Sequence, residues 1–355
     1  MIPKYNKVHN RFKLNGYHFD RDSLLSVAYS YIKEGDHYEK DTGDFLLNWM
    51  DDNDFIEVST SGSTGTPKTI KLDKQAMVRS AIATGDYFGL EPGNRALLCL
   101  PTHYVAGKMM LVRAIILGLE IDIVTPSSHP MDFAKGTYDF CAMVPFQLSN
   151  TVVNLDRIKK LIVGGSSVSK DLIERIQDVK TKIYETYGMT ETITHIAARP
   201  LNHLSTSTTP EPFTTFPNLA LETDDRGCLV ISAHYLNVDH IVTNDVVELI
   251  SKNQFNLLGR HDNVINSGGI KLFPEIIEGK LSGKINARFF VAAEADNELG
   301  ERVVLVLESD KEKLDATVFE GLDKYEVPKQ VYYVESFAET TSGKIQRNKT
   351  LELVR

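Results

Sequence analysis

The stretch Val58–Lys71 reads V-S-T-S-G-S-T-G-T-P-K-T-I-K and combines hydroxyl side chains, glycines and lysines in one short segment. Gly62 and Gly65 allow backbone conformations that a side chain would forbid, so successive N–H groups can converge on one anion. The hydroxyl groups add further donors, and Lys68 adds a positive charge. We therefore predict a phosphate-binding loop, formed by Thr60, Ser61, Gly62, Ser63, Thr64, Gly65, Thr66 and Lys68.

The order of glycine, proline and lysine decides which kind of phosphate loop this is. A Walker-type loop needs Gly immediately before the Lys, and it leads from a strand into a helix. Here Pro67 precedes Lys68, apolar residues alternate into the loop, and Thr69–Leu72 resembles a second short strand. A strand–loop–strand turn is therefore favoured, which argues against a phosphate-loop kinase or GTPase. Taken alone, the segment would also suit a flexible Ser/Gly linker.

Length and composition describe an ordinary globular protein. At 355 residues the chain is long enough for one large domain and a smaller one. Hydrophobic residues make up 42% and charged residues 25%, and the net charge is −9. This acidic balance argues against a general nucleic-acid surface. An anionic substrate would have to be attracted by local cations.

The cysteines and the N-terminal sequence indicate the cellular compartment in which the protein is expected. Cys99, Cys141 and Cys228 are scattered through apolar runs without metal-type spacing, which predicts buried thiols in a reducing compartment. The first residues lack an apolar signal segment, and no uninterrupted apolar run is long enough to span a bilayer. We therefore expect a cytoplasmic protein without a membrane span.

Strand-like and helix-like segments alternate in the first 200 residues. The predicted strands lie at 96–100, 121–124, 140–144, 161–163 and 182–184. The predicted helices lie at 23–32, 108–119 and 170–179, with another after a capping Asp73. This alternation predicts an α/β fold with a mostly parallel sheet that helices cover on both faces.

Beyond about residue 201 the character of the sequence changes. Short strands follow at 229–233, 246–250 and 255–258, and a separate block begins at His261 with a Gly-rich loop, a helix after Pro274 and further strands. We place the boundary at Arg260–Asn263. The expected organisation is a large N-terminal domain (1–260) of mixed, mostly parallel sheets with covering helices, and a small α+β C-terminal domain (261–355).

Several further clusters lie where strands are expected to end, which is where open α/β sheets bind ligands. They are Gly164-Gly165-Ser166, Tyr187-Gly188-Met189-Thr190-Glu191, Thr243-Asn244-Asp245, Gly259-Arg260-His261-Asp262 and Ser342-Gly343-Lys344. Each cluster taken alone is more often an ordinary turn, a helix start or a solvated lysine. Their order along the chain, after the phosphate loop, is more informative than any one of them.

Together these motifs closely resemble the adenylate-forming superfamily, which includes acyl-CoA synthetases, luciferases and peptide-synthetase adenylation domains. The resemblance runs from about residue 55 to the C-terminus. It implies a two-step ligase in which a carboxylate attacks the α-phosphorus of Mg·ATP and a thiol, usually coenzyme A, then displaces AMP. ATP, Mg²⁺, coenzyme A and a small carboxylic acid are thus the expected partners.

The resemblance also implies roles for individual residues. Loop 59–68 would hold the β- and γ-phosphates, Thr190 the α-phosphate, and Glu191 the Mg²⁺. The remaining nucleotide-binding residues would be Gly164, Gly165, Ser166, Tyr187, Gly188, Met189, Asp245 and Arg260. Lys344 would neutralise charge where the two anions meet. The C-terminal domain would rotate about Asp262, and the Ser267-Gly268-Gly269 turn would then line the path of the thiol.

The chain departs from the superfamily pattern at three points, one of which is Gly227-Cys228, where relatives commonly have Gly-Glu. Its segment before the phosphate loop is shorter than in most relatives, which implies a trimmed subdomain. Tyr104 stands where relatives usually carry a histidine.

The identity of the acid is suggested by Ala106–Arg113, which looks like the corresponding segment of o-succinylbenzoate–CoA ligases of menaquinone synthesis. His103, Tyr104, Lys108 and Arg113 would line the acid pocket. A cation there would suit a second, unreacted carboxylate. Alternatively both cations face solvent, and the acid is a different acyl or aryl acid. A non-catalytic nucleotide-binding relative is a further alternative, and the sequence makes no prediction of oligomeric state.

Overall fold

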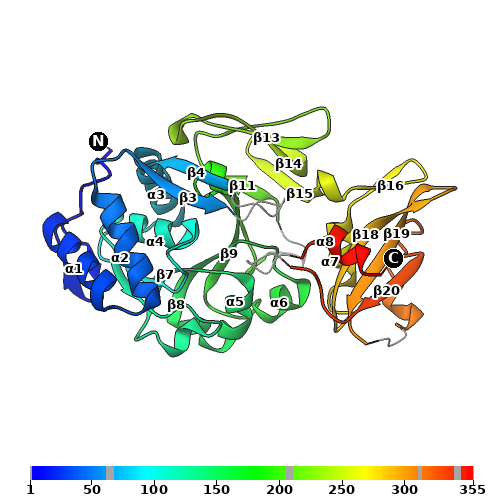
Figure 1. The fold of residues 1–355 in the computed structure, drawn as a ribbon, viewed down its shortest axis with the longest axis horizontal. Coiled ribbons are helices and arrows are strands. Elements are labelled where there is room, and N and C mark those ends of the chain that lie inside the picture. Colours follow the sequence, from blue (N-terminus) through cyan, green and yellow to red (C-terminus); the bar gives the residue numbers. More distant parts are fainter. Residues whose placement is uncertain (1, 61–67, 205–210, 311–313, 340–344, 355) are drawn as a thin grey trace.

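The computed structural model describes residues 2–60, 68–204, 211–310, 314–339 and 345–354. One long sheet runs through the larger, N-terminal part of the molecule, and a smaller sheet forms the C-terminal part (Figure 1). Helices lie against both sheets, so the predicted α/β class is confirmed.

The large sheet has the order β12-β13-β14-β15-β11-β10-β9-β8-β7-β5-β6-β1-β2. Its parallel strands are β1 (Lys13–Leu14), β5 (Arg95–Leu98), β6 (Glu120–Ile123), β7 (Tyr138–Met143), β8 (Ile158–Val163) and β9 (Lys182–Gly188). Its antiparallel strands are β2 (Tyr17–His18), β10 (His195–Pro200), β11 (Phe213–Thr215), β12 (Ala220–Thr223), β13 (Cys228–Ala233), β14 (Val238–Ser251) and β15 (Gln254–Arg260). The parallel order stops at β9, because the connection from β9 to β10 is too short for a crossover helix.

Alternate residues of the parallel strands enter two different hydrophobic clusters. On β5, Leu97 belongs to one cluster and Leu98 to the other, as the period of two in a strand requires. The face that carries Leu98 packs against α3 (Lys74–Phe88) and α4 (Val105–Leu117), and α1 (Arg21–Glu34) and α2 (His37–Met50) contribute to the same cluster. The face that carries Leu97 packs against α5 (Pro145–Thr151) and α6 (Lys170–Arg175).

The predicted phosphate loop lies between β3 (Phe55–Thr60) and β4 (Lys68–Asp73), which pair in antiparallel fashion with Val58 opposite Ile70. The predicted strand–loop–strand arrangement is therefore confirmed. Asp73 also caps α3 as predicted, because its carboxylate accepts a hydrogen bond from the backbone N–H of Ala76.

Four element boundaries differ from the prediction. Helix α4 begins at Val105 rather than Lys108 and stops at Gly118, whose left-handed conformation ends it. Helix α6 is shorter than predicted, and β14 is far longer. Strand β9 continues to Gly188, so Tyr187 lies inside a strand rather than after it. Helix α2 was not predicted.

The smaller sheet contains β16 (Ile265–Ser267), β17 (Ile270–Leu272), β18 (Arg288–Asp296), β19 (Gly300–Glu308) and β20 (Gln330–Val334). Helix α7 (Pro274–Leu281) packs on one face and α8 (Arg347–Glu352) on the other. The chain passes from the large sheet to this one through a short 3₁₀ turn, His261–Asn263. The division into two domains at residue 260 stays a prediction.

The cysteines and the helices can be compared with the predictions of buried thiols and of a chain without a membrane span. All three cysteines are buried free thiols, as expected. Among the described residues, no helix has the length and apolar character needed to cross a membrane.

Candidate active site

Three of the predicted nucleotide-binding residues meet on the large sheet, two on the paired strands β14 and β15 and one on β9. The hydroxyl of Tyr187 on β9 donates a hydrogen bond to Asp245 Oδ2 over 2.6 Å. The guanidinium of Arg260 on β15 donates to Asp245 Oδ1 over 2.9 Å. Asp245 lies opposite Arg260 in the β14–β15 register, so the strand pairing itself brings this carboxylate and cation together.

The environment fixes the protonation of this cluster. Tyr187 and Asp245 are each only 8% exposed. Burial, followed by the nearby negative charge of Asp245, raises the pKa of the Tyr187 phenol, so the phenol stays protonated and donates. The backbone N–H of Asp245 in turn donates to Thr243 Oγ1 over 3.1 Å.

The Gly164–Gly165 turn lies beside this cluster, at the carboxyl end of β8. A side chain at Gly164 would place its Cβ 2.7 Å from Thr186 Oγ1 of β9, so glycine is required for the close approach. Gly165 adopts φ +93°, a conformation that favours glycine. Ser166 follows and is exposed. The ends of β8 and β9 thus form one continuous edge.

The residues after β9 form a compact 3₁₀ turn, Thr190–Thr192. The Thr192 hydroxyl accepts from the Met189 N–H over 3.0 Å and donates to the Thr194 carbonyl over 2.8 Å. This anchoring leaves Thr190 half-buried and Glu191 exposed. The turn also contacts β4, the strand that leaves the predicted phosphate loop. Thr190 and Glu191 therefore lie beside the hairpin that carries this loop.

Part of the predicted site cannot be placed. Lys344 and the loop residues Ser61, Gly62, Ser63, Thr64, Gly65 and Thr66 lie outside the described residues. Thr60 is the last residue of β3 and Lys68 the first residue of β4, but their side chains are likewise outside the description. Their roles stay predictions.

The acidic residues near this turn could bind Mg²⁺ only together with the phosphates of ATP. Within the described part of the chain, no three His, Cys, Asp or Glu side chains cluster as a metal site. Mg²⁺ in nucleotide sites is usually held by one or two carboxylates together with phosphate oxygens and water. Glu191, exposed and outside every ion pair found among the described residues, fits that requirement.

Arg113 on α4 is a buried charge. Its side chain is 1% exposed, and Nη2 donates to Thr194 Oγ1 over 3.3 Å. Nε has no hydrogen-bond partner, and no carboxylate among the described residues lies within 4.0 Å of the guanidinium. Burial lowers its pKa to about 9. The alternative that both predicted pocket cations face solvent is therefore wrong for Arg113.

The other predicted acid-pocket residues lie at the opposite end of α4. Lys108 is half-buried, and its Nζ donates to the carbonyls of Thr102 and His103 over 2.6 and 3.0 Å. His103 and Tyr104 are exposed, and His103 Nδ1 lies 3.1 Å from Asp41 of α2. Lys108 precedes Arg113 by five residues, which is about 1.4 turns of helix, and His103 and Tyr104 lie before the first residue of α4.

Sequence reasoning missed the residues that surround Arg113. His195 is buried, and its Nε2 lies 3.0 Å from Thr84 Oγ1 of α3. Burial and the Arg113 charge lower the pKa of His195 well below its ordinary value, so the imidazole is neutral. A His four residues after the Tyr187–Glu191 motif was the available signal, but its burial depends on packing between α3, α4 and β10.

The predicted hinge and thiol path lie at the junction with the smaller sheet. Asp262 accepts from Asn244 Nδ2 over 3.2 Å and lies 3.7 Å from Arg260. Gly268 and Gly269 form a two-residue turn between β16 and β17, both with positive φ, as such hairpins require. Ser267, which precedes the turn, is buried.

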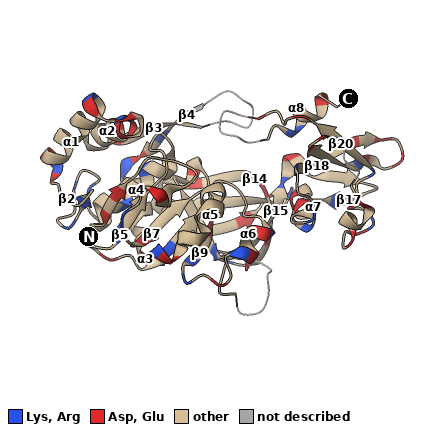
Figure 2. Cartoon of the chain, turned by 90° about the horizontal axis from the view of Figure 1, so that it is seen from below, with Lys and Arg blue, Asp and Glu red and all other residues tan. Residues whose placement is uncertain are grey.

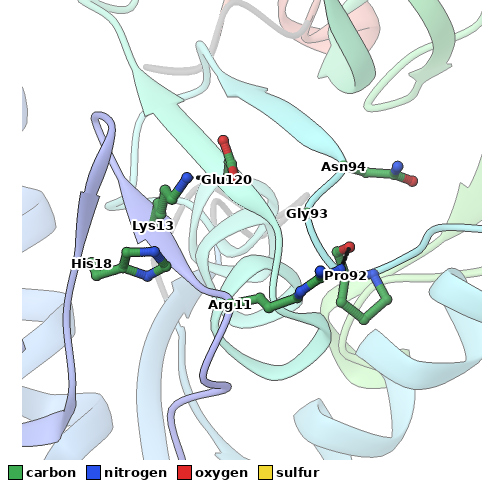
Figure 3. Close-up of a pocket in the computed structure, with 7 residues that line it drawn as sticks. All are labelled: Arg11, Lys13, His18, Pro92, Gly93, Asn94 and Glu120. Carbon is green, nitrogen blue, oxygen red and sulfur yellow. Dashed lines mark hydrogen bonds and ion pairs between the residues drawn. The ribbon is translucent and has the colours of Figure 1, made fainter.

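A cavity of about 570 Å³ lies elsewhere on the large sheet (Figure 3). It is lined by Arg11, Lys13, His18, Pro92, Gly93, Asn94 and Glu120. Lys13 and Glu120 begin the parallel strands β1 and β6, so this cavity lies at the amino ends of strands whose carboxyl ends face the site. None of the predicted site residues lines it.

Figure 2 shows basic and acidic residues interspersed along the elements in view. Local cations such as Arg113 and Arg260, rather than the overall field, are therefore what an anionic substrate would meet.

Comparison with known proteins adds independent findings. The AMP-binding enzyme family matches residues 38–222. An acyl-CoA synthetase (AMP-forming)/AMP-acid ligase II-like protein from Dyadobacter fermentans is 34% identical, with 93% of this chain and 98% of that chain covered and a TM-score of 0.62.

Two further relatives carry a more specific name. The 2-succinylbenzoate–CoA ligase of Listeria monocytogenes is 25% identical over 92% of this chain and 75% of its own length. The O-succinylbenzoate coenzyme A synthetase of Bacillus subtilis, in complex with ATP and magnesium ion, has a TM-score of 0.72 at 19% identity, covering 83% of this chain and 69% of that chain. At 19% identity, the similarity to the Bacillus subtilis structure supports the fold alone.

Proposed function

Because this chain belongs to the AMP-binding enzyme family, we propose that it joins o-succinylbenzoate to coenzyme A by way of an acyl-adenylate. The coarser activity is that of an AMP-forming acid–CoA ligase. The acid, the thiol and the residue roles below are the proposal.

The reaction proceeds in two displacements. A carboxylate oxygen of the acid attacks the α-phosphorus of ATP, the bond from that phosphorus to the bridging oxygen breaks, and pyrophosphate leaves. The sulfur of coenzyme A, having lost its proton, then attacks the acyl carbon, and AMP leaves. Positioning and neutralisation of charge are what such a site has to supply.

The described residues would hold the nucleotide from several sides. Tyr187 and the Gly164–Gly165 turn would flank the adenine, while Asp245 and Arg260 would fix the ribose. Thr190 would donate to the α-phosphate. Glu191 would hold Mg²⁺, which supplies positive charge beside the phosphates.

Arg113 is the observation that carries the specificity proposal. A buried cation without a carboxylate partner is unfavourable by several kcal/mol unless a ligand completes the pair. Arg113 donates a hydrogen bond to Thr194, which follows the turn that carries Thr190 and Glu191. A second carboxylate on the substrate, away from the reacting one, would accept charge-assisted hydrogen bonds from this guanidinium.

The proposal is tested by thioester formation with a panel of acids: o-succinylbenzoate, benzoate and medium-chain fatty acids. We expect o-succinylbenzoate to give the highest kcat/KM. ATP–pyrophosphate exchange that depends on the acid would separate an enzyme from a nucleotide-binding relative. A clear preference for a monocarboxylate would defeat the specificity proposal but leave the ligase activity intact.

Replacement of Arg113 tests the role of its charge. Arg113→Met keeps an unbranched apolar side chain in the core and removes the donor, so we expect the KM for o-succinylbenzoate to rise about 10- to 100-fold, as for loss of a charged hydrogen bond. The KM for benzoate should change little. Arg113→Lys keeps the charge, so its KM for o-succinylbenzoate should lie between those of the unmodified protein and Arg113→Met. An equal effect on both acids would assign Arg113 a structural role instead.

A further inference from the structure

The cavity of about 570 Å³ on the large sheet lies outside the candidate active site (Figure 3). Three parallel strands begin beside it, because Lys13 of β1 and Arg95 of β5 each pair with Glu120 of β6. The backbone N–H groups of Lys13, Gly93 and Glu120 already donate to carbonyls of the chain over 3.2, 2.8 and 2.9 Å. A ligand in this cavity would therefore be held mainly by side chains.

The strand register places three polar side chains of this cavity in one row. His18 of β2 lies opposite Lys13, and Lys13 lies opposite Glu120, so the three belong to the same face of neighbouring strands. Arg11 lines the same cavity, while Phe12, between the two cations, is buried in the core. Figure 3 shows the four polar side chains together at the cavity. The alternation of polar and apolar residues from Arg11 thus supplies both a core contact and a polar surface.

The charges of these side chains do not cancel. Lys13 Nζ lies 2.7 Å from Glu120 Oε1, so these two form an ion pair. Arg11 Nη1 donates to the Pro92 carbonyl over 3.1 Å, and among the described residues no carboxylate lies within 4.0 Å of its guanidinium. The Pro92 contact holds the guanidinium at the cavity and leaves its other N–H groups without a partner in the described part of the chain. The cavity therefore contains a positioned cation that lacks a counter-charge.

The imidazole of His18 adds a second group that can bind an anion. Its Nδ1 lies 3.2 Å from the Phe12 carbonyl, and because a carbonyl only accepts, Nδ1 carries a proton. Nε2 has no partner among the described residues. In the imidazolium form Nε2 also carries a proton and donates, and an anionic ligand beside the ring favours this form.

We propose that this cavity binds a small phosphate monoester, with the phosphate on Arg11 and His18 and a hydroxyl of the same molecule on Glu120. A guanidinium and an imidazolium match the charge and the oxygens of a phosphate dianion. Glu120 Oε2 has no partner within the described residues, so it can accept from a hydroxyl. The volume is within the range of small-molecule sites. None of these residues belongs to the candidate active site, so the inference does not depend on the proposed function.

Nuclear magnetic resonance of the full chain labelled at histidine observes this cavity separately from the rest of the protein. The sequence has 10 histidines, and His18→Gln identifies the signal of His18. The probes are ribose 5-phosphate, inorganic phosphate and ribose. We expect ribose 5-phosphate to move the His18 signal and to bind more tightly than inorganic phosphate, and ribose to cause no shift.

Substitutions of the charged side chains test their roles. Arg11→Gln should raise the Kd of ribose 5-phosphate at least about tenfold, as for loss of a charge-assisted hydrogen bond. Glu120→Gln releases Lys13 from its ion pair and removes a negative charge, so inorganic phosphate should bind about fivefold more tightly. Lys252→Gln removes a charge from an exposed lysine outside the cavity and should leave both Kd values unchanged. Urea denaturation verifies that each variant is folded.

Three results would overturn the assignment. They are a His18 signal that ribose 5-phosphate does not move, equal Kd values in Arg11→Gln and Lys252→Gln, and an affinity for ribose 5-phosphate no higher than for inorganic phosphate. Shifts confined to other histidines would mean that the phosphate binds elsewhere, and they would equally contradict a site at the amino ends of β1 and β6.

Discussion

At the scale of single residues, the hydrogen bond between Tyr187 and Asp245 joins positions 58 residues apart in the chain. Tyr187→Phe keeps the ring and removes only the donor, leaving the buried Asp245 carboxylate with one fewer partner. A hydrogen bond to a charged group contributes about 1.5–3 kcal/mol. We expect the KM for ATP to rise about tenfold, measured by pyrophosphate exchange at saturating acid.

The matched control for this substitution is Tyr184→Phe, three residues earlier on β9. Tyr184 is half-buried, and among the described residues its hydroxyl makes no hydrogen bond. Its loss should leave the KM for ATP unchanged. Equal effects in both variants would mean that β9 is simply destabilised, and that Tyr187 does not position Asp245.

Lys108 predicts a specific pH dependence of stability. Burial lowers its pKa from the ordinary 10.5 to about 8. Between these values the folded chain has released a proton that the unfolded chain still binds, so unfolding takes up a proton and stability rises with pH. Relative to Lys108→Met, the unmodified protein should therefore gain free energy of unfolding from about pH 7 to about pH 10.

Urea denaturation at several pH values checks this expectation. The comparison with Lys108→Met cancels the titration of other groups, and Lys40→Met, at an exposed lysine of α2, should show no such trend. If the difference in free energy of unfolding between the unmodified protein and Lys108→Met did not change with pH, the lowered pKa of Lys108 would be contradicted. The neutral amine still donates to the Thr102 and His103 carbonyls, so these contacts survive deprotonation.

At the scale of elements, local sequence predicted those structures whose determinants are local. The β3–β4 hairpin and the start of α3 follow from alternating apolar residues and from Asp73 as a cap. Helix α2 was missed because its buried residues include Thr42 and Gly43, which do not mark an apolar face. Strand β14 is longer than predicted. Its first residues include exposed polar ones such as Asp239 and His240, which do not indicate a strand, but pairing with β13 and β15 extends the strand beyond its apolar part.

The contact between β15 and α7 offers a test at this scale. Gly259 of β15 faces Glu275 of α7 so closely that an added Cβ would collide with the Glu275 carboxylate, whose Oε2 is buried without a partner. Gly259→Ala should therefore separate the strand from the helix and destabilise the protein by about 1–3 kcal/mol.

A double-mutant cycle isolates this contact. Glu275→Ala removes the obstructing carboxylate, so the pair Gly259→Ala/Glu275→Ala should be more stable than the sum of the single effects, by at least about 1 kcal/mol in urea denaturation. Gly279→Ala, on α7 where a Cβ meets no atom within 4 Å, should not destabilise. Additive single effects would show that the Gly259–Glu275 contact does not couple the two elements.

At the scale of the whole molecule, the motifs predicted which residues would be neighbours, but not how each is buried. Asp245 and Arg260 come together because they are opposite in the β14–β15 pairing, whereas Tyr187 reaches Asp245 from β9, which β10 and β11 separate from β15. The burial of Arg113 could not be predicted, because an Arg on a helix usually extends to solvent and only the packing of α3, α4 and β10 encloses it. The cavity beside His18 likewise depends on segments that are distant in sequence.

The predicted rotation of the C-terminal part gives the last test, through Lys344. The residues on either side of Lys344 belong to the smaller sheet's layer: Ile345 pairs with Glu339, and the Gln346 N–H donates to the Ala338 carbonyl over 2.7 Å. We therefore expect Lys344 to move together with that part of the chain. If the part alternates between two positions, Lys344 serves only the step in which the nucleotide and acid meet.

Lys344→Ala should accordingly abolish acid-dependent ATP–pyrophosphate exchange, because no other charge replaces the lost amine where two anions approach. Thioester formation from supplied acyl-adenylate and coenzyme A should be nearly normal, since that step uses the other position. Lys349→Ala, at an exposed lysine of α8, controls for a general loss of charge and should spare both steps. Equal losses in both half-reactions would mean that Lys344 remains at the reacting groups throughout, and that the two parts of the molecule do not alternate.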